Sequence, residues 1–359
     1  WTSKQPLPKR KCEIYEVAQT MRFDMNDPLR AYILRQFAKR AVKAHRWDVA
    51  SKFHASLRRT GAARPSDGVR HAKAVETMGR KEEAEQLHRE NAVNFPLDPN
   101  IHRQNGLFLL RHQKETQAIQ AFARALALAP DNEVLKTDLK RLGVDEDVFV
   151  PLAVSAFYGS PPPRPARPGP VAKLLARRAA RRAKVLRQSG DWPAALAAQA
   201  VLLKHNPHSA SAQIRLGHIL KALGRPREAE TAYWRGVALA PRDAESYLQL
   251  AHGLKLARSL NDAAPAFLLT QKLHPGHQEA GVAVQECGLS ESEGADWTER
   301  LASGDISAIL KVGRGAETNA CRDRSNEHHT RPKRPDSKAV DVLAVAIAGD
   351  IARAVGASL

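Results

Sequence analysis

The chain has 359 residues, a formal net charge of +18 and an aromatic content of only 5%. This length allows two ordinary domains, but so few aromatic residues argue against one large aromatic core. The longest apolar stretch, residues 340–355, includes Asp341, Asp350 and Arg353 and is shorter than the roughly 20 apolar residues of a membrane span, which excludes a transmembrane helix there. The three cysteines are scattered and form no CxxC pair, which argues against a disulfide framework.

Prolines recur along the chain at a fixed spacing. The interval from Pro96 to Pro130 is repeated from Pro207 to Pro241 and again from Pro241 to Pro275. Each of these prolines ends an apolar helical stretch, such as ALALAP at 125–130. A period of this length, about 34 residues, predicts a solenoid of helical hairpins. For such a fold we expect binding rather than catalysis.

The rest of the sequence follows the same period. When each proline is counted as residue 32 of its unit, units start at Pro65, Pro99, Ala176, Ala210 and Ala244. A sixth unit in the same phase starts at Ala31 and has Ala62 in place of the proline. Residue 20 is alanine in every unit, which allows two helices to cross closely: Ala50, Ala84, Ala118, Ala195, Ala229 and Ala263. Residue 8 is small in every unit: Ala38, Ala72, Gly106, Ala183, Gly217 and Ala251. Residue 24 is large or long: His54, His88, Phe122, Gln199, Tyr233 and Phe267.

This pattern resembles the tetratricopeptide repeat family, most closely in residues 210–243. The matching residues there are Leu216, Gly217, Leu220, Ala229, Tyr233 and Pro241. Gln213 stands where the family has an early tryptophan. The resemblance covers about 31–132 and 176–280. It implies an all-α, right-handed superhelical solenoid, here with two arrays of three units.

The breaks in the period predict the domain organisation. An N-terminal segment, 1–30, precedes the first array at 31–145, which ends with a capping helix at 132–142. Residues 146–175 include the stretch SPPPRPARPGP and predict a proline-rich linker. The alternative is one superhelix in which residues 154–158 pack back onto a groove. The second array spans 176–290, and we expect the tail, 291–359, to be poorly ordered.

Local signals predict where helices start and turn. Asp98, Ser209 and Asp243 are expected N-caps, and Pro99 follows the first of them at the position where proline suits a helix. Gly79, Gly190 and Gly224 are expected in the turns between the two helices of a unit.

The N-terminus informs the expected location. The chain starts at Trp1, so we expect a fragment, a processed product or an incomplete gene model. Residues 1–30 contain no apolar stretch typical of a signal peptide. We therefore expect a cytoplasmic protein.

A row of cations is expected inside the groove. In the tetratricopeptide family the first helix of each unit lines the concave groove with its residues 2, 5, 9 and 12, which share one helical face. The basic and histidine residues at these positions are Arg35, Lys39, Lys73, Arg103, Arg177, Lys184, Arg187, His218, Lys221, His252 and Lys255. The apolar groove residues are expected to be Leu107, Leu110 and Leu248.

Such a groove predicts an interaction scaffold that binds an acidic peptide or protein. A polyanionic glycan would suit the same charges, whereas nucleic acid is disfavoured because aromatic residues are not interleaved with the cations. The asparagines that carboxylate-gripping relatives use are absent at these positions. The plainer interpretation is that a basic chain places solvated cations on every exposed face.

Signs of catalysis are missing from the sequence. No nucleotide-binding glycine motif, nucleophile elbow or HExxH motif occurs, so we expect no catalytic residues, no metal and no cofactor. Asp145-Glu146-Asp147 matches a DxD pattern without an α/β domain around it, and the histidine pairs 205/208 and 274/277 straddle turns.

Two alternatives stay open. The chain is similar to the alanine- and arginine-rich repeats that precede the catalytic domain of bacterial envelope-polysaccharide glycosyltransferases. It would then be the non-catalytic arm of such an enzyme. A self-assembling scaffold, whose end repeats stack between chains, is the other.

Overall fold

The computed structural model describes residues 28–164 and 168–315, and it describes side chains up to residue 310. Within these residues every regular element is a helix and no strand forms. The expected N-terminal segment up to residue 27, and the C-terminal tail from residue 316 with its apolar stretch at 340–355, lie outside the described residues.

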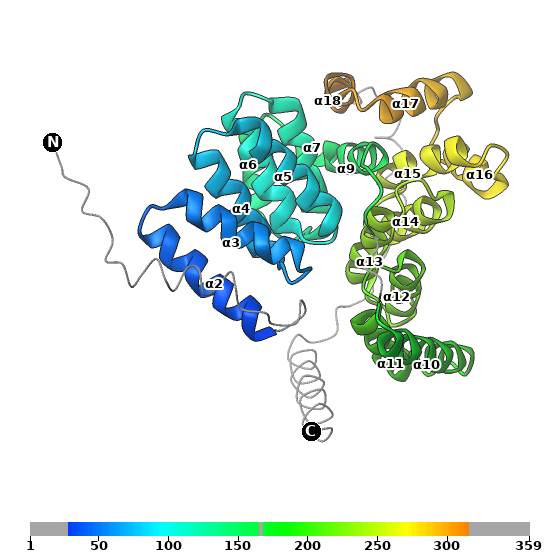
Figure 1. Cartoon of the computed structure of the whole chain (residues 1–359). Coiled ribbons are helices and arrows are strands. Elements are labelled where there is room, and N and C mark those ends of the chain that lie inside the picture. The colour runs from blue at the N-terminus through cyan, green and yellow to red at the C-terminus, as the bar shows by residue number, and fades with distance from the viewer. Residues whose placement is uncertain (1–27, 165–167, 316–359) are drawn as a thin grey trace, which may run out of the picture. The chain divides into compact units, whose positions relative to one another are not determined.

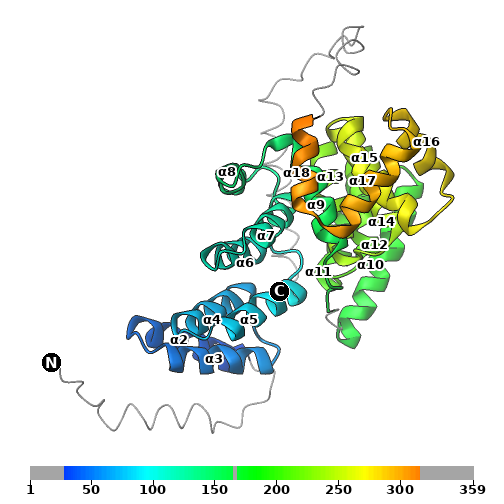
Figure 2. The ribbon, with the colours of Figure 1, turned by 90° about the horizontal axis from the view of Figure 1, so that it is seen from above.

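The first run of helices forms three hairpins (Figure 1) and a single following helix, labelled α8 in Figure 2. The hairpins are α2 (Pro28–Lys43) with α3 (Trp47–Arg59), α4 (Pro65–Thr77) with α5 (Lys81–Asn94), and α6 (Pro99–Arg111) with α7 (Glu115–Leu128). Helix α8 (Glu133–Arg141) follows, starts at the N-cap Asn132 and buries Leu135 and Leu139. The helix expected at 132–142 is therefore present.

The second run continues the period one hairpin further than the sequence indicates. Its hairpins are α10 (Pro170–Gln188) with α11 (Trp192–His205), α12 (Ala210–Ala222) with α13 (Pro226–Leu239), α14 (Ala244–Ala257) with α15 (Leu260–Leu273), and α16 (Gln278–Glu286) with α17 (Glu291–Ser303). Helix α18 (Ile306–Gly315) ends the described chain.

The fourth hairpin of this run differs from the expectation of a poorly ordered tail from residue 291. Helix α16 begins at the same interval after α14 as α14 begins after α12, so it is in register with the repeat. Gln285 and Trp297 stand at its residues 8 and 20, where the other units have small side chains, so the repeat pattern is not visible in the sequence. Leu301, at residue 24, and Ile306 and Ile309 beyond it are nevertheless buried.

Small residues at fixed positions make the hairpins tight. The alanine at residue 20 is buried in all six predicted units, with an exposed fraction of at most 1%. The expected N-caps form, since the side chains of Asp98, Ser209 and Asp243 each accept a hydrogen bond from a backbone N–H of the first turn. Gly224, in the turn between α12 and α13, has a φ of +70°, which glycine adopts without strain.

Tyr233 shows why residue 8 must be small. Its ring is fully buried between two glycines, because a Cβ at Gly217 would lie 2.4 Å from one ring edge and a Cβ at Gly253 would lie 2.5 Å from the other. Gly106 and Phe122 repeat this contact in the third hairpin, where the distance would be 2.8 Å. The glycine thus provides the space that the large residue 24 fills.

We predict that Gly217→Ala destabilises the fold although alanine is the better helix former. Overpacking costs roughly 1–3 kcal/mol, which exceeds the roughly 1 kcal/mol of helix propensity gained. Gly294→Ala, in α17, is the matched control, because its Cβ would meet only ordinary contacts at 3.5 Å or more. Urea denaturation should show a lower free energy of unfolding for Gly217→Ala and an equal or higher one for Gly294→Ala. Equal stability of both variants would contradict this packing argument.

Helix α9 (Phe149–Tyr158), preceded by a short 3₁₀ turn (Glu146–Val148), packs between the two runs of hairpins (Figures 1 and 2). It contacts α7 on one side and α15 and α17 on the other, and all its residues except Pro151 are buried. The ring of Phe157 meets Trp234 of α13, with centroids 5.7 Å apart. The guanidinium of Arg124 in α7 donates to the carbonyl oxygen of Ala156 at 3.0 Å.

The first part of the expected linker is therefore a core helix. Pro151 lies in the first turn of α9, where a missing N–H costs nothing. Residues 154–158 do pack back onto the repeats, but onto the second helices of the hairpins rather than onto the first helices that line the groove. Residues 161–164 and 168–169 are non-helical. The division of the chain into two arrays stays a prediction.

Candidate functional site

The first helices of the second run share a hollow of 640 Å³. Its lining residues come from α10, the start of α11, α12 and α14: Lys184, Arg187, Gln188, Trp192, His218, Lys221, Ala222 and Gln249. Four of the predicted groove residues lie in it, because residues 9 and 12 of successive first helices share one side of the hairpins. The structure thus brings together Lys184, Arg187, His218 and Lys221.

The three cations of this hollow lack acidic partners. Among the described residues, Lys184, Arg187 and Lys221 form no ion pair with a carboxylate. Arg187 is half-buried, and its Nε is buried without a hydrogen-bond partner in the described part of the chain. A guanidinium donor that is removed from water without a partner is costly, so this group is well suited to bind an anionic ligand.

A hydrogen-bonded chain orders another part of the lining of this hollow. Gln249 donates through Nε2 to the Glu245 carboxylate at 2.8 Å, which leaves Oε1 of Gln249 as the acceptor for His218 Nε2, also at 2.8 Å. His218 must therefore carry its proton on Nε2. Burial lowers the pKa of His218, and the charges of Lys221 and Arg187 lower it further. The imidazole is neutral at physiological pH and acts as a donor to Gln249 rather than as a cation.

Two of the four predicted groove residues of the first run are neutralised by ion pairs. Arg35 pairs with Asp67 at 2.8 Å and so joins the first hairpin to the second. Arg103 pairs with Asp138 at 2.9 Å and so joins the third hairpin to α8. Lys73 lines a separate hollow of 440 Å³. Glu76 lies in the same hollow and pairs with Arg111 there. Lys39 is exposed on α2.

At the far end of the second run, a carboxylate of the next hairpin neutralises the predicted lysine in the same way. Lys255 pairs with Glu286 at 2.9 Å, and His252 lies 3.1 Å from Glu279. Arg177 is exposed on α10, about two turns before Lys184. Among the described residues, three unpaired cations of the predicted groove, Lys184, Arg187 and Lys221, therefore gather in one hollow over α10 and α12. Lys39, Lys73 and Arg177, which also form no ion pair there, lie outside this hollow.

Carboxylates on the following helix explain why only some of the predicted cations stay unpaired. The pairing residues Asp67, Asp138 and Glu286 each lie about one repeat after the cation that they neutralise. Glu279 follows His252 at a similar interval, and burial lowers the pKa of this histidine. The sequence pattern of the groove includes only the cations at inward positions, so it does not predict these ion pairs.

Several residues of the site were not predicted. Trp192 supplies an aromatic wall, and Gln188 and Gln249 supply amides, yet none stands at the inward positions that the family pattern indicates. Of the expected apolar contacts, Leu248 is only 4% exposed and belongs to the core, so it offers no ligand surface. Leu110 is 38% exposed on α6.

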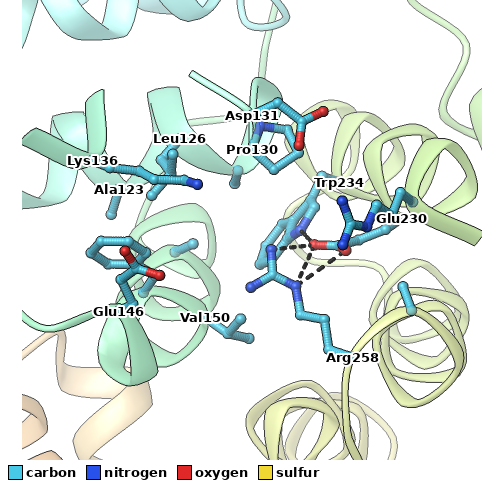
Figure 3. A pocket seen from close by; sticks show the side chains of 15 residues that line it. Ala123, Leu126, Pro130, Asp131, Lys136, Glu146, Val150, Glu230, Trp234 and Arg258 are labelled. Atoms are coloured by element: carbon cyan, nitrogen blue, oxygen red, sulfur yellow. Dashed lines mark hydrogen bonds and ion pairs between the residues drawn. The ribbon is translucent and has the colours of Figure 1, made fainter. Parts of the chain in front are cut away.

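A second cavity, of 260 Å³, lies where α7, α9 and α13 meet the end of α14 (Figure 3). Its buried carboxylate, Glu230, accepts two hydrogen bonds from Arg258 Nε, at 3.0 and 3.2 Å, and one from Trp234 Nε1 at 3.3 Å. Lys136 and Glu146 line the opposite side. Because the buried carboxylate is already satisfied, this cavity has the character of a structural junction.

The residues considered for metal binding do not gather. Within the described residues, no group of three or more His, Cys, Asp and Glu side chains is placed to hold a metal ion. Glu146 of the DxD-like turn pairs with Lys140 at 2.7 Å. No described helix is long and apolar enough to cross a membrane.

Comparison with known proteins gives a fold likeness only. No family model matches the chain, and no curated protein matches it either. Its structure is similar to that of the TPR2AB domain of yeast Sti1, solved as a complex with pHSP90, at 14% identity and a TM-score of 0.29, over 76% of this chain and 97% of that one.

Two further solved structures are comparable. The thermophilic TPR protein TTC0263 of Thermus thermophilus has 17% identity and a TM-score of 0.26, over 63% of this chain and all of that one (100%). YrrB, described as a TPR protein with an unusual peptide-binding site, has 12% identity and a TM-score of 0.27, over 61% and 91%.

At these identities and TM-scores the likeness extends to the fold alone. The tetratricopeptide-type fold rests on the chain's own hairpins. They repeat at a fixed interval, bury an alanine at residue 20 and pair a small residue 8 with a large residue 24.

Proposed function

We propose that the protein is an interaction scaffold that holds an acidic segment of a partner protein in the groove over α10 and α12. The observation that carries this proposal is the set of three unpaired cations, Lys184, Arg187 and Lys221, in one hollow. Trp192 would pack against apolar parts of the segment, and Gln188 and Gln249 would bond its backbone.

The charges in the groove would act mainly on encounter and orientation. Cations near solvent speed association and favour acidic partners, so affinity should fall as salt is added. Each such contact contributes roughly 0.5–1 kcal/mol at a partly exposed site. Removal of three of them should therefore raise Kd by roughly 10- to 100-fold.

The experiment measures binding of a fluorescein-labelled polyglutamate peptide by anisotropy, with a polyglutamine peptide as the neutral reference. The groove variant is Lys184→Gln/Arg187→Gln/Lys221→Gln. The control is Lys52→Gln/Arg59→Gln/Arg70→Gln, which removes the same charge from exposed positions on α3 and α4. We expect the groove variant to lose affinity for polyglutamate and the control to retain it.

An equal loss of affinity in both variants would show that only net charge matters and would refute the proposal that the groove is the binding site. A heparin fragment or a single-stranded oligonucleotide that displaces the peptide at lower concentration would indicate a polyanionic partner other than a protein. The alternative role as the non-catalytic arm of a larger glycosyltransferase stays a prediction, because a recruiting groove would serve there too.

A further inference from the structure

Helix α10 has a second, separate basic surface on its outer side. Viewed along the helix, this side lies opposite Ala176, Ala179 and Ala183, which are buried in the hairpin. Residues three or four apart share a helical face. We call this side the outer face of α10, and it consists of Val171, Leu174, Arg178, Arg181, Arg182 and Val185.

The aliphatic residues of the outer face are unusually exposed. Val171 is 70% exposed, Leu174 is 56% exposed and Val185 is 62% exposed. Helix α10 begins the second run of hairpins and packs chiefly against α11, so no earlier hairpin of this run covers it. Terminal helices of solenoids normally present a polar outer side, which makes this combination of aliphatic and basic residues notable.

The charge of the helix is entirely of one sign. Helix α10 contains seven Lys or Arg residues and no Asp or Glu. Among the described residues none of the seven pairs with a carboxylate. Helix α11 adds Lys204, and the only acidic residue of the whole hairpin, 170–205, is the N-cap Asp191.

We propose that the outer face of α10 docks the protein on an anionic lipid surface. Amphipathic helices that lie in a membrane interface combine exposed aliphatic residues with Lys and Arg, and anionic headgroups attract each nearby cation. The arginine stems extend along apolar surface while their guanidinium groups reach the phosphates. The 19 residues of α10 would lie along the surface over about 28 Å.

The arrangement of the outer face favours lipid over an acidic partner helix. Its aliphatic residues lie near the two ends, Val171 and Leu174 at one and Val185 at the other, with three arginines between them. A partner helix needs a continuous apolar seam at spacings of three and four residues. The outer face also lacks carboxylates and neutral hydrogen-bonding side chains that would fix the register of a protein partner. A fluid anionic surface requires neither feature.

The test is flotation of the full chain with vesicles of phosphatidylcholine alone and of phosphatidylcholine mixed with phosphatidylglycerol. The charge variant is Arg178→Gln/Arg181→Gln/Arg182→Gln, and its control is Lys52→Gln/Arg59→Gln/Arg70→Gln. The apolar variant is Leu174→Ser/Val185→Ser. Its control is Leu256→Ser/Val282→Ser, which changes two aliphatic residues of similar exposure, each 55%. Circular dichroism checks that all four variants fold.

We expect wild type to bind only the anionic vesicles. The charge variant should lose about tenfold or more in partition coefficient, the apolar variant should lose several-fold, and both controls should bind as wild type does. The charge variant should still bind polyglutamate in the groove assay, so that failure there and failure here are distinguishable. Absence of binding to anionic vesicles, or equal loss in a variant and its control, would overturn the proposal. If the outer face bound an acidic amphipathic peptide and the protein did not bind vesicles, the proposal would also be overturned.

Discussion

Acidification from neutral pH toward pH 4 is expected to unfold the first three hairpins before the rest of the described repeats. Burial lowers the pKa of four histidines in these hairpins from 6.5 to about 4: His54, His71, His88 and His102. All four are at most 5% exposed. In the unfolded chain each imidazole returns to its ordinary pKa.

The direction of the effect follows from proton binding. The unfolded chain takes up protons at these histidines below pH 6.5, whereas the folded chain takes them up only near pH 4. Their contribution to stability is therefore complete above pH 6.5 and is lost as the pH falls toward 4. Each histidine accounts for about 3 kcal/mol over this window. Four of them together match the whole stability of an ordinary domain, about 5–15 kcal/mol.

Hydrogen exchange followed by mass spectrometry across this pH range would locate the unfolding. A double variant tests the role of the histidines. His54 and His88 stand at residue 24 of their units, where Phe122 and Phe267 stand in others. The unit of Phe267 also has an alanine at residue 8, as the units of both histidines do, so phenylalanine suits that pairing. His54→Phe/His88→Phe should shift the acid transition to lower pH. An unchanged transition would show that other groups govern it.

The repeat itself was largely predictable from the sequence. Proline spacing, alanine at residue 20 and the glycine turns are local signals, and the alanines and glycines have a direct steric reason in the structure. Gly217 illustrates this, because the close contact with Tyr233 is what keeps residue 8 small. The helices α2 to α7 and α10 to α15 follow from that pattern.

The parts that escaped prediction depend on contacts between distant segments. Helix α9 is apolar on every side apart from Ser155 and contains Pro151, so neither periodicity nor proline rules identify it as a helix. Its order comes from α7, α15 and α17, and the last two of these are far away in the chain. Trp297 and Gln285 likewise hide the hairpin α16–α17, which tertiary burial of Leu301 holds in place.

The candidate site was predictable only in part for the same reason. Inward positions on first helices indicate which cations face the groove, but they do not show which carboxylates reach them from the next hairpin. Arg35 and Lys255 were expected to be available and are paired, whereas Lys184 and Lys221 stay unpaired in the described residues. The difference depends on the acidic residues of a neighbouring unit, so the sequence of one unit does not reveal it.

Loss of the guanidinium at the junction cavity is expected to destabilise the fold strongly. Glu230 is 4% exposed and has Arg258 as its ion-pair partner. Arg258→Met would leave a buried carboxylate with only the Trp234 N–H, which costs about 3–5 kcal/mol. The free energy of unfolding in urea should fall by this amount. The double variant Glu230→Leu/Arg258→Met should recover most of it, because no buried charge is then left alone.

The chain offers a closely matched control for this prediction. Arg300 is 34% exposed, almost the same as Arg258 at 33%, and it pairs with Asp296. Asp296 is 57% exposed, so water solvates it when the arginine is removed. Arg300→Met should therefore cost less than about 1 kcal/mol. If both arginine variants lost the same stability, burial of the carboxylate would not be the cause, and the junction would depend on the packing of the arginine stem instead.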